Sequence, residues 1–256
     1  DERIEFLKSE IERVAGSINS DTRPILPIRE IALEGHRTGS KVLSGIDRLA
    51  GLPAALPLGI LGALLLLIFC IGRRIGAPGV AVGGVGLGSF LLQLLVLLSY
   101  QAFTGLLYHA IVILTAIFMA GAALGAYASM RIRSVGRKEL YAVHGGFIVL
   151  SILLFGIHTD AFRMSVSYPL VNGAYFILSC LTGALTGAYY PLVVRTALPE
   201  GEGSIPATYY AWDLFGACIG GSIGGILLFP LVGFAGSVLF IAGIHIAAPL
   251  LLVGRW

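Results

Sequence analysis

The sequence predicts an all-α, polytopic membrane protein, a helix bundle of about seven transmembrane helices with a short amphipathic extramembranous segment at its amino terminus. Of the 256 residues, 57% are hydrophobic and 12% are charged, and the mean hydropathy is +0.90. Soluble domains carry about 25% charged residues. The charges are also uneven, since residues 1–52 hold 8 of the 17 Lys and Arg and 9 of the 14 Asp and Glu. We therefore divide the chain into an extramembranous segment, 1–52, and a transmembrane bundle, 53–256.

The amino-terminal segment contains two predicted helices that are not membrane spans. Its first apolar side chains recur at helical spacing, at Ile4, Leu7, Ile11 and Val14, which predicts a short amphipathic helix. The stretch 38–51 places apolar side chains on one face and Lys41 and Arg48 on the other. That pattern is typical of an interfacial helix leading into the membrane.

Seven apolar stretches follow, each long enough to cross a bilayer at 1.5 Å per residue. The predicted spans are 53–72, 80–102, 106–129, 140–158, 170–194, 207–229 and 233–253. Basic residues follow alternate spans, as at 131–138 and Arg195, and the positive-inside rule makes that side cytoplasmic. The protein is then a multi-pass protein of the cell (inner) membrane, with its amino-terminal segment on the extracytoplasmic side. The net charge of +3 reflects this topology and does not indicate nucleic-acid binding.

Glycines at four-residue spacing predict close helix packing. The expected packing positions are Gly121, Gly125, Gly183, Gly187, Gly216, Gly220 and Gly224. "GAALGAY" (121–127) and "GALTGAY" (183–189) echo each other at the ends of the third and fifth spans. They are either parallel repeats of one unit or a chance recurrence of packing motifs. The glycines of "VGGVGLGSF" (82–90) follow no strand, so they favour helix packing over a nucleotide-binding loop.

Asp213 is a carboxylate within the sixth predicted span. On a helical wheel it shares a face with Gly216, Gly220 and Gly224, which indicates that this face packs against protein and not lipid. A carboxylate at mid-bilayer costs roughly 2.5–3.5 kcal/mol, and an interior position near the interface lowers that cost. Two interpretations stay open: a cation or proton site, or a structural pin to Arg195 or to a loop amide.

Other polar residues of the spans give weaker candidates. With Asp213, the candidate substrate-binding residues are Tyr209, Gln101 and Tyr108. Thr182, Tyr189 and His245 either line a cavity or bond across helices. His144 and His158 lie fourteen residues apart in one span and, with His109, are candidate haem ligands, or else hydrogen-bonded histidines near the interface. The spacing of the three cysteines suggests no metal site, no complete catalytic site is recognisable, and the cofactor is unknown.

The stretch "YYAWDLFGACIGGSIGGILLFPLVGFAG" (209–236) resembles the Tyr-x-x-Asp-x-x-Gly-x-x-x-Gly and Leu-x-Pro-Leu-x-Gly pattern of spermidine synthase-like integral membrane proteins. "SYQAFTGLLYHAIVILTAIFMAGAALGAY" (99–127) resembles their Gln-x-x-x-Gly-x-x-Tyr and Phe-Met-x-Gly stretches, and "INSDTRPI" (18–25) their Asn-x-Asp-x-x-Pro segment. In that family a Rossmann-like, aminopropyltransferase-like domain binds the substrates. This chain holds at most the tail of that domain, residues 1–25, so no catalytic residue carries over.

The resemblance implies the membrane moiety of a spermidine synthase-like protein, acting as anchor and partner subunit in a larger membrane assembly. Its partners would be the lipid bilayer and other membrane subunits or further copies of itself. One alternative is a transporter for a polyamine-like cation, with Asp213 as counter-charge. Another is a haem- or quinone-binding membrane subunit of a redox complex. Whether the protein takes part in catalysis is left open, because an aminopropyltransferase-like domain is not recognisable in this chain.

Overall fold

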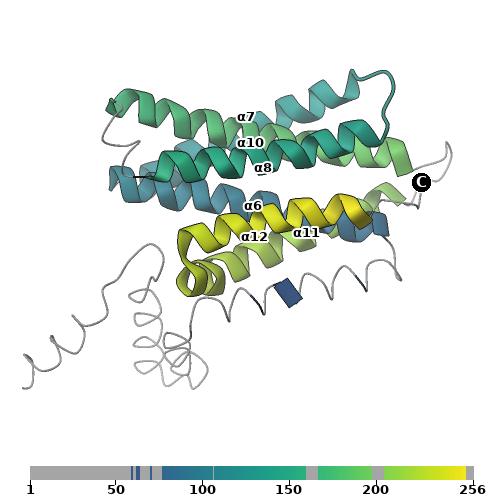
Figure 1. Ribbon diagram of the computed structural model, residues 1–256. Helices are drawn as coiled ribbons and strands as arrows, with labels where there is room; N and C mark the ends of the chain where they lie inside the picture. Colours follow the sequence, from purple (N-terminus) through teal and green to yellow (C-terminus); the bar gives the residue numbers. More distant parts are fainter. Residues whose placement is uncertain are drawn as a thin grey trace, which may run out of the picture. The chain divides into compact units, whose positions relative to one another are not determined.

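The computed structural model describes residues 77–105, 107–159, 167–197 and 205–251, with the isolated positions 59, 62, 63 and 70. These residues are helical apart from short turns and contain no strand. Their elements, labelled in Figure 1, are α6 (Ala77–Thr104), α7 (Leu107–Met130), α8 (Arg137–His158), α10 (Tyr168–Ala197), α11 (Ile205–Ile223), the π-helical turn η1 (Gly224–Leu228) and α12 (Phe229–Leu251). The predicted segment 1–52, with its orientation, and most of the first predicted span, 53–72, lie outside the described residues.

The prediction of a helical membrane bundle is confirmed at this level. Five described helices are long and apolar enough to cross a membrane: Gly79–Thr104, Ile111–Met130, Arg137–His158, Tyr168–Thr196 and Leu231–Leu250. The count of seven spans is not met by the described residues. The sixth predicted span, 207–229, is the one that differs. Its helix α11 ends at Ile223 in a π-helical turn, and Asp213 and a run of tyrosines lower its apolar character.

The chain divides into two compact units, Asp1–Ile60 with Ile226–Ser237, and Leu61–Gly225 with Val238–Trp256. In the described part of the first unit, Gly233 has φ 67° and kinks α12. This left-handed backbone conformation is open to glycine and strained for other residues. Ser237 donates a hydrogen bond of 2.7 Å to the Gly233 carbonyl, one turn below the kink. All of the functional geometry described below lies in the second unit.

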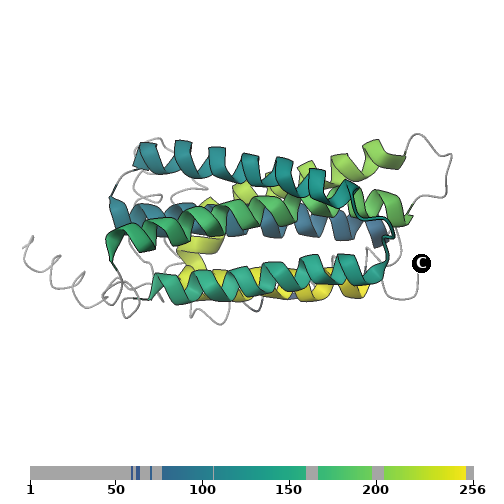
Figure 2. The same cartoon turned by 90° about the horizontal axis from the view of Figure 1, so that it is seen from above.

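Within the second unit, α7 and α10 form the most extensive helix pair, and they meet at the two echoed motifs. Gly121 and Gly125 of α7 lie against the backbone of Cys180 and Ala184 of α10. In return, Gly183 and Gly187 of α10 lie against the backbone of Phe118 and Ala122 of α7. The residue numbers of the contacting positions increase in the same direction along both helices, so α7 and α10 run parallel. Each glycine contact in one motif has a counterpart in the other motif. Figure 2 shows these helices side by side.

The second close pair is α6 with α11, and it is also parallel. Gly216 of α11 lies against the carbonyl of Gly83 of α6, and Gly86 lies against the carbonyl of Asp213. Gly220 approaches Leu87, where an added Cβ would lie 2.8 Å from the carbonyl oxygen. The last predicted packing glycine, Gly224, is buried at the start of η1. Because glycine has no side chain, the backbones approach closely enough for dispersion contacts to hold the pairs together in an apolar medium.

Loop contacts show which helix ends lie together. Arg195, near the end of α10, donates hydrogen bonds of 3.2 Å to the Ser129 carbonyl and 3.4 Å to the Arg133 carbonyl. The basic segment 131–138 and Arg195 therefore share one end of the second unit, as the charge pattern predicts. We call it the basic end.

Candidate functional site

Two histidines meet in the interior of the second unit. His144 of α8 is 2% exposed and His245 of α12 is 0% exposed, and their Nδ1 atoms are 3.3 Å apart. Phe147, one turn from His144, stacks on the His245 ring at 4.2 Å between centroids with an interplanar angle of 8°. A buried imidazole without partners is costly, so the pair is stabilised by sharing one hydrogen bond and by ring stacking.

Tyr189 of α10 extends this pair to a third helix. Its hydroxyl lies 3.2 Å from His144 Nε2, and its ring packs edge-on against the His144 ring at 5.1 Å. The phenol is 1% exposed. Tyr189, His144 and His245 thus form a continuous hydrogen-bonded line, called here the histidine cluster, across α10, α8 and α12.

The far end of the line lies against α6 at Gly88. A Cβ added to Gly88 would lie 2.6 Å from His245 Nε2, so the absence of a side chain there makes room for the imidazole. One turn earlier, Gly84 faces Ala248 at an ordinary 3.6 Å. His245 Nε2 is buried without a hydrogen-bond partner in the described part of the chain. It is the one ring nitrogen of the pair that is not used within the cluster.

The hydrogen-bonding pattern permits two arrangements of protons. When His144 Nδ1–H donates to His245 Nδ1, His144 Nε2 accepts from the Tyr189 hydroxyl and His245 carries its proton on Nε2. When His245 Nδ1–H donates to His144 Nδ1, His144 Nε2–H donates to the Tyr189 oxygen and His245 Nε2 is bare. A neutral imidazole has one donor and one acceptor nitrogen, so both arrangements satisfy the bonds between the three side chains.

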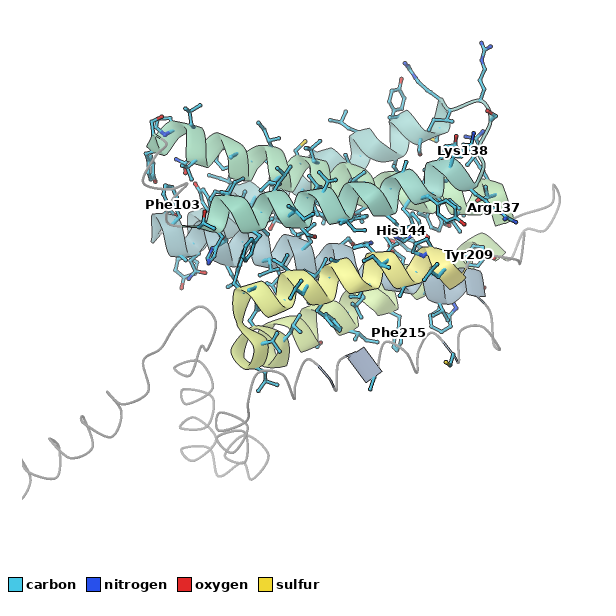
Figure 3. The ribbon with its side chains drawn as sticks, in the orientation of Figure 1. Phe103, Arg137, Lys138, His144, Tyr209 and Phe215 are labelled. Atoms are coloured by element: carbon cyan, nitrogen blue, oxygen red, sulfur yellow. The ribbon has the colours of Figure 1, made fainter. Side chains whose placement is uncertain are left out.

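The histidine cluster lies toward the basic end. His144 follows Arg137 and Lys138 by about two helical turns, and Figure 3 shows it on the side of α8 toward α12, away from Phe103 at the opposite end. The cluster is therefore buried, but it lies within a few turns of the loops at that end.

Asp213 of α11 is half-buried beside this region. Its carboxylate is within electrostatic range of the Tyr189 and Tyr190 hydroxyls. Its Oδ1 lies 2.8 Å from the position that a Cβ on Gly86 would take, so the side chain rests on the backbone of α6. Of the two predicted partners for a pin, Arg195 bonds instead to the Ser129 and Arg133 carbonyls.

A second polar group, called here the serine cluster, lies at the opposite end. Ser99 Oγ of α6 is 2.8 Å from His158 Nδ1 of α8 and 2.7 Å from the Tyr175 hydroxyl of α10. One turn along α10, Ser179 and Gln93 exchange hydrogen bonds of 3.0 and 3.2 Å. The Leu114 carbonyl, 2.8 Å from Ser179 Oγ, is a second acceptor for the same hydroxyl proton.

The other predicted substrate-binding residues do not gather around Asp213. Gln101 lies near the carboxyl end of α6, and Tyr108 lies in the first turn of α7 with 80% of its side chain exposed. Both are at the end opposite the basic end. Tyr209, half-buried in α11, lies one turn before Asp213 and stays a candidate neighbour.

The haem candidates fit the geometry poorly at His144, since both of its ring nitrogens are engaged in the cluster. His158 is bonded through Nδ1 to Ser99. His109 lies in the first turn of α7, and its side chain is outside the described residues. Among the residues that the structure describes, no group of three or more His, Cys, Asp and Glu is placed to hold a metal ion.

The sequence identifies each member of the histidine cluster as a polar candidate, but only the fold joins them. The sequence predicts His144 as a haem ligand or an interfacial histidine, and Tyr189 and His245 as separate polar groups. One signal was available, since Gly88 and His245 each stand near the middle of a long apolar stretch and glycine favours close approach to a ring.

Comparisons with known proteins give no identification: no family model, curated protein or solved structure matches the chain. The resemblance to spermidine synthase-like membrane proteins therefore stays a prediction. The fold and site define a helical membrane bundle with a buried tyrosine–histidine–histidine line.

Proposed function

We propose that this chain is a membrane protein that transfers protons through the histidine cluster. The observation that carries the proposal is the contact of 3.3 Å between the Nδ1 atoms of His144 and His245, in the interior of an apolar bundle. Ionisable side chains inside a membrane bundle are expensive and commonly mark ion or proton pathways. Histidine is suited to this role because its two nitrogens can gain and lose protons near neutral pH.

The transfer follows from the two arrangements of protons. A proton accepted by the Tyr189 oxygen displaces the phenolic proton to His144 Nε2. His144 Nδ1–H then passes its proton to His245 Nδ1, and His245 releases one from Nε2 to a water molecule, since that nitrogen has no protein partner among the described residues. One proton enters and one leaves. Moving the same protons back would cancel the transfer, so the line is reset by reorientation of the three side chains. Asp213, within electrostatic range of Tyr189, favours the arrival of positive charge at that end.

The test is proton flux into vesicles that contain the purified full chain and a trapped pH-sensitive dye, driven by a potassium diffusion potential. The variants are His144→Gln and His245→Gln. The control is Ser151→Ala, which changes a fully buried hydroxyl of α8 that donates to the Phe147 carbonyl of its own helix. We expect the wild type and the control to carry protons and each histidine variant to lose roughly a hundredfold. Wild-type flux no greater than that of empty vesicles overturns the proposal.

The anchor role fits within this proposal. Five apolar helices would cross the bilayer. Two further spans would be α11, which lies beside α6, and the stretch 53–72. Such a chain would serve as the membrane moiety of a larger assembly. Purification from native membranes tests this directly. Copurification of an aminopropyltransferase-like subunit, or attachment of such a domain, would support the spermidine synthase-like reading, and a chain isolated alone would oppose it.

Transport of a polyamine-like cation is a second candidate, favoured by the half-buried position of Asp213 near Tyr189 and Tyr190 and by its lack of an ion pair among the described residues. Uptake of a radiolabelled polyamine by the same vesicles tests it. Asp213→Asn should abolish uptake if the carboxylate is the counter-charge. Unchanged uptake, or none by the wild type, rejects this candidate.

A further inference from the structure

The opposite end of the second unit holds another imidazole in a hydrogen-bonded line. His158, Ser99 and Tyr175 come from α8, α6 and α10, and α8 and α10 are the helices that also supply His144 and Tyr189. His158, the last residue of α8, is half-buried with its Nε2 atom enclosed, whereas Ser99 and Tyr175 are 1% and 0% exposed. The serine cluster therefore runs from the end of α8 into the interior.

Ser99 is placed to pass a proton between its two neighbours. A hydroxyl has one donor and two acceptor positions, and both contacts of Ser99 are short, at 2.8 and 2.7 Å. When His158 Nδ1–H donates to the Ser99 oxygen, the Ser99 proton can move to the Tyr175 oxygen and the Tyr175 proton can move onward. One proton enters at the imidazole and one leaves at the phenol.

A polar stripe on α10 joins the two clusters. Its hydroxyl side chains recur every three or four residues, at Tyr175, Ser179, Thr182, Thr186 and Tyr189. This spacing keeps them on one face of the helix. Tyr175, Ser179, Thr182 and Tyr189 are at most 1% exposed. The stripe therefore faces neighbouring helices and not lipid, as hydroxyl side chains in membrane bundles commonly do.

We propose that the serine cluster is a second proton-transfer site, and that the stripe on α10 carries the proton between it and the histidine cluster. This inference rests on the proposed function and extends it from one buried site to a path with two ends. His158, the last residue of α8, is the member of the path nearest the loops opposite the basic end. Thr182 and Thr186 donate to carbonyls of their own helix and keep oxygen lone pairs free to accept hydrogen bonds from water along the path.

The experiment is the vesicle flux assay with Ser99→Ala and Tyr175→Phe. Ser89→Ala is the matched control, since Ser89 is a buried serine of α6 whose hydroxyl donates to the Gly86 carbonyl of its own helix. We expect Ser99→Ala and Tyr175→Phe each to lower flux about tenfold and Ser89→Ala to leave it unchanged. Thermal unfolding of each purified variant in detergent identifies any variant that fails to fold. If Ser99→Ala fails, Tyr175→Phe, which keeps the aromatic ring, tests the proposal by itself.

The possible outcomes separate the two proposals. If the histidine variants stop flux while Ser99→Ala and Tyr175→Phe leave it intact, the second site is wrong and the histidine cluster stands. If Ser89→Ala lowers flux as much as Ser99→Ala, the effect is one of packing and the second site is also rejected. If the histidine variants carry protons like the wild type, both proposals fall together.

Discussion

Gly125 of α7 lies so close to the carbonyl of Ala184 of α10 that no side chain fits between the helices. The same relation is repeated with the roles exchanged, because Gly187 of α10 lies against Ala122 of α7. The two echoed motifs thus face each other as two copies of one sequence would in a parallel helix dimer. An interface of this kind explains why both motifs occur in one chain and at the same level of the bundle.

This interlock predicts a sharp contrast between two glycine substitutions. Gly125→Ala should lower the free energy of unfolding by about 1–3 kcal/mol, because its Cβ would collide with the α10 backbone. Gly145→Ala, on α8, should be neutral or stabilising, since nothing lies within 4 Å of the added atom. Unfolding of both purified variants in detergent measures the difference. Equal stability of the two would mean that α7 and α10 do not meet at these glycines.

Gly88→Ala should disrupt the histidine cluster from the α6 side. The added Cβ would lie 2.6 Å from His245 Nε2, so the imidazole must move and its contact with His144 is lost. Gly84→Ala, one turn away, meets Ala248 at 3.6 Å and should be tolerated. We expect Gly88→Ala to lower proton flux about tenfold and Gly84→Ala to leave it unchanged. Equal proton flux in the two variants would mean that His245 does not pack against Gly88.

Asp213→Asn should weaken proton transfer and leave the fold intact. The backbone carbonyl and Oδ1 of Asp213 both lie against Gly86, and asparagine has nearly the same shape as aspartate. Loss of the charge removes its attraction for a proton near Tyr189, and we expect flux to fall about threefold to tenfold with unchanged thermal unfolding. A large loss of stability instead would support the structural pin between helices.

Arg195→Gln should destabilise the basic end. The guanidinium of Arg195 holds the carbonyls of Ser129 and Arg133 after α7, and its removal should cost about 1 kcal/mol. Arg133→Gln is the control, because Arg133 takes part through its backbone and its side chain is exposed. Thermal unfolding is again the measurement. A comparable loss in the control would assign the effect to net charge.

Local patterns were enough to predict the helices and the glycine positions at which they approach a neighbour. Long apolar stretches predicted α6, α7, α8 and α10 to within a few residues, and the glycines at 121, 125, 183 and 187 mark where α7 and α10 approach. These features depend on residues a few positions apart in one helix. In α11, Gly216 and Gly220 lie against the backbone of α6, and so does the Asp213 carbonyl.

The histidine cluster depends on which helices are neighbours, and periodicity along one helix does not contain that information. His144 and His245 are 101 residues apart, and their contact requires α8 to pack beside α12. The sequence also gives no sign of the break of α11 at Ile223, since a π-helical turn at Gly224–Leu228 leaves the apolar pattern unchanged. Gln101 and Tyr108 were grouped with Asp213 by chemistry alone, and the fold separates them.

The most direct test is nitrogen-15 magnetic resonance of histidine-labelled protein in lipid bilayers. A shared proton between His144 and His245 predicts a measurable coupling across the hydrogen bond between their Nδ1 atoms, present in the wild type and in Ser151→Ala and absent in His245→Gln. Two uncoupled imidazoles, each exchanging protons independently with water, would contradict the histidine cluster and the function built on it.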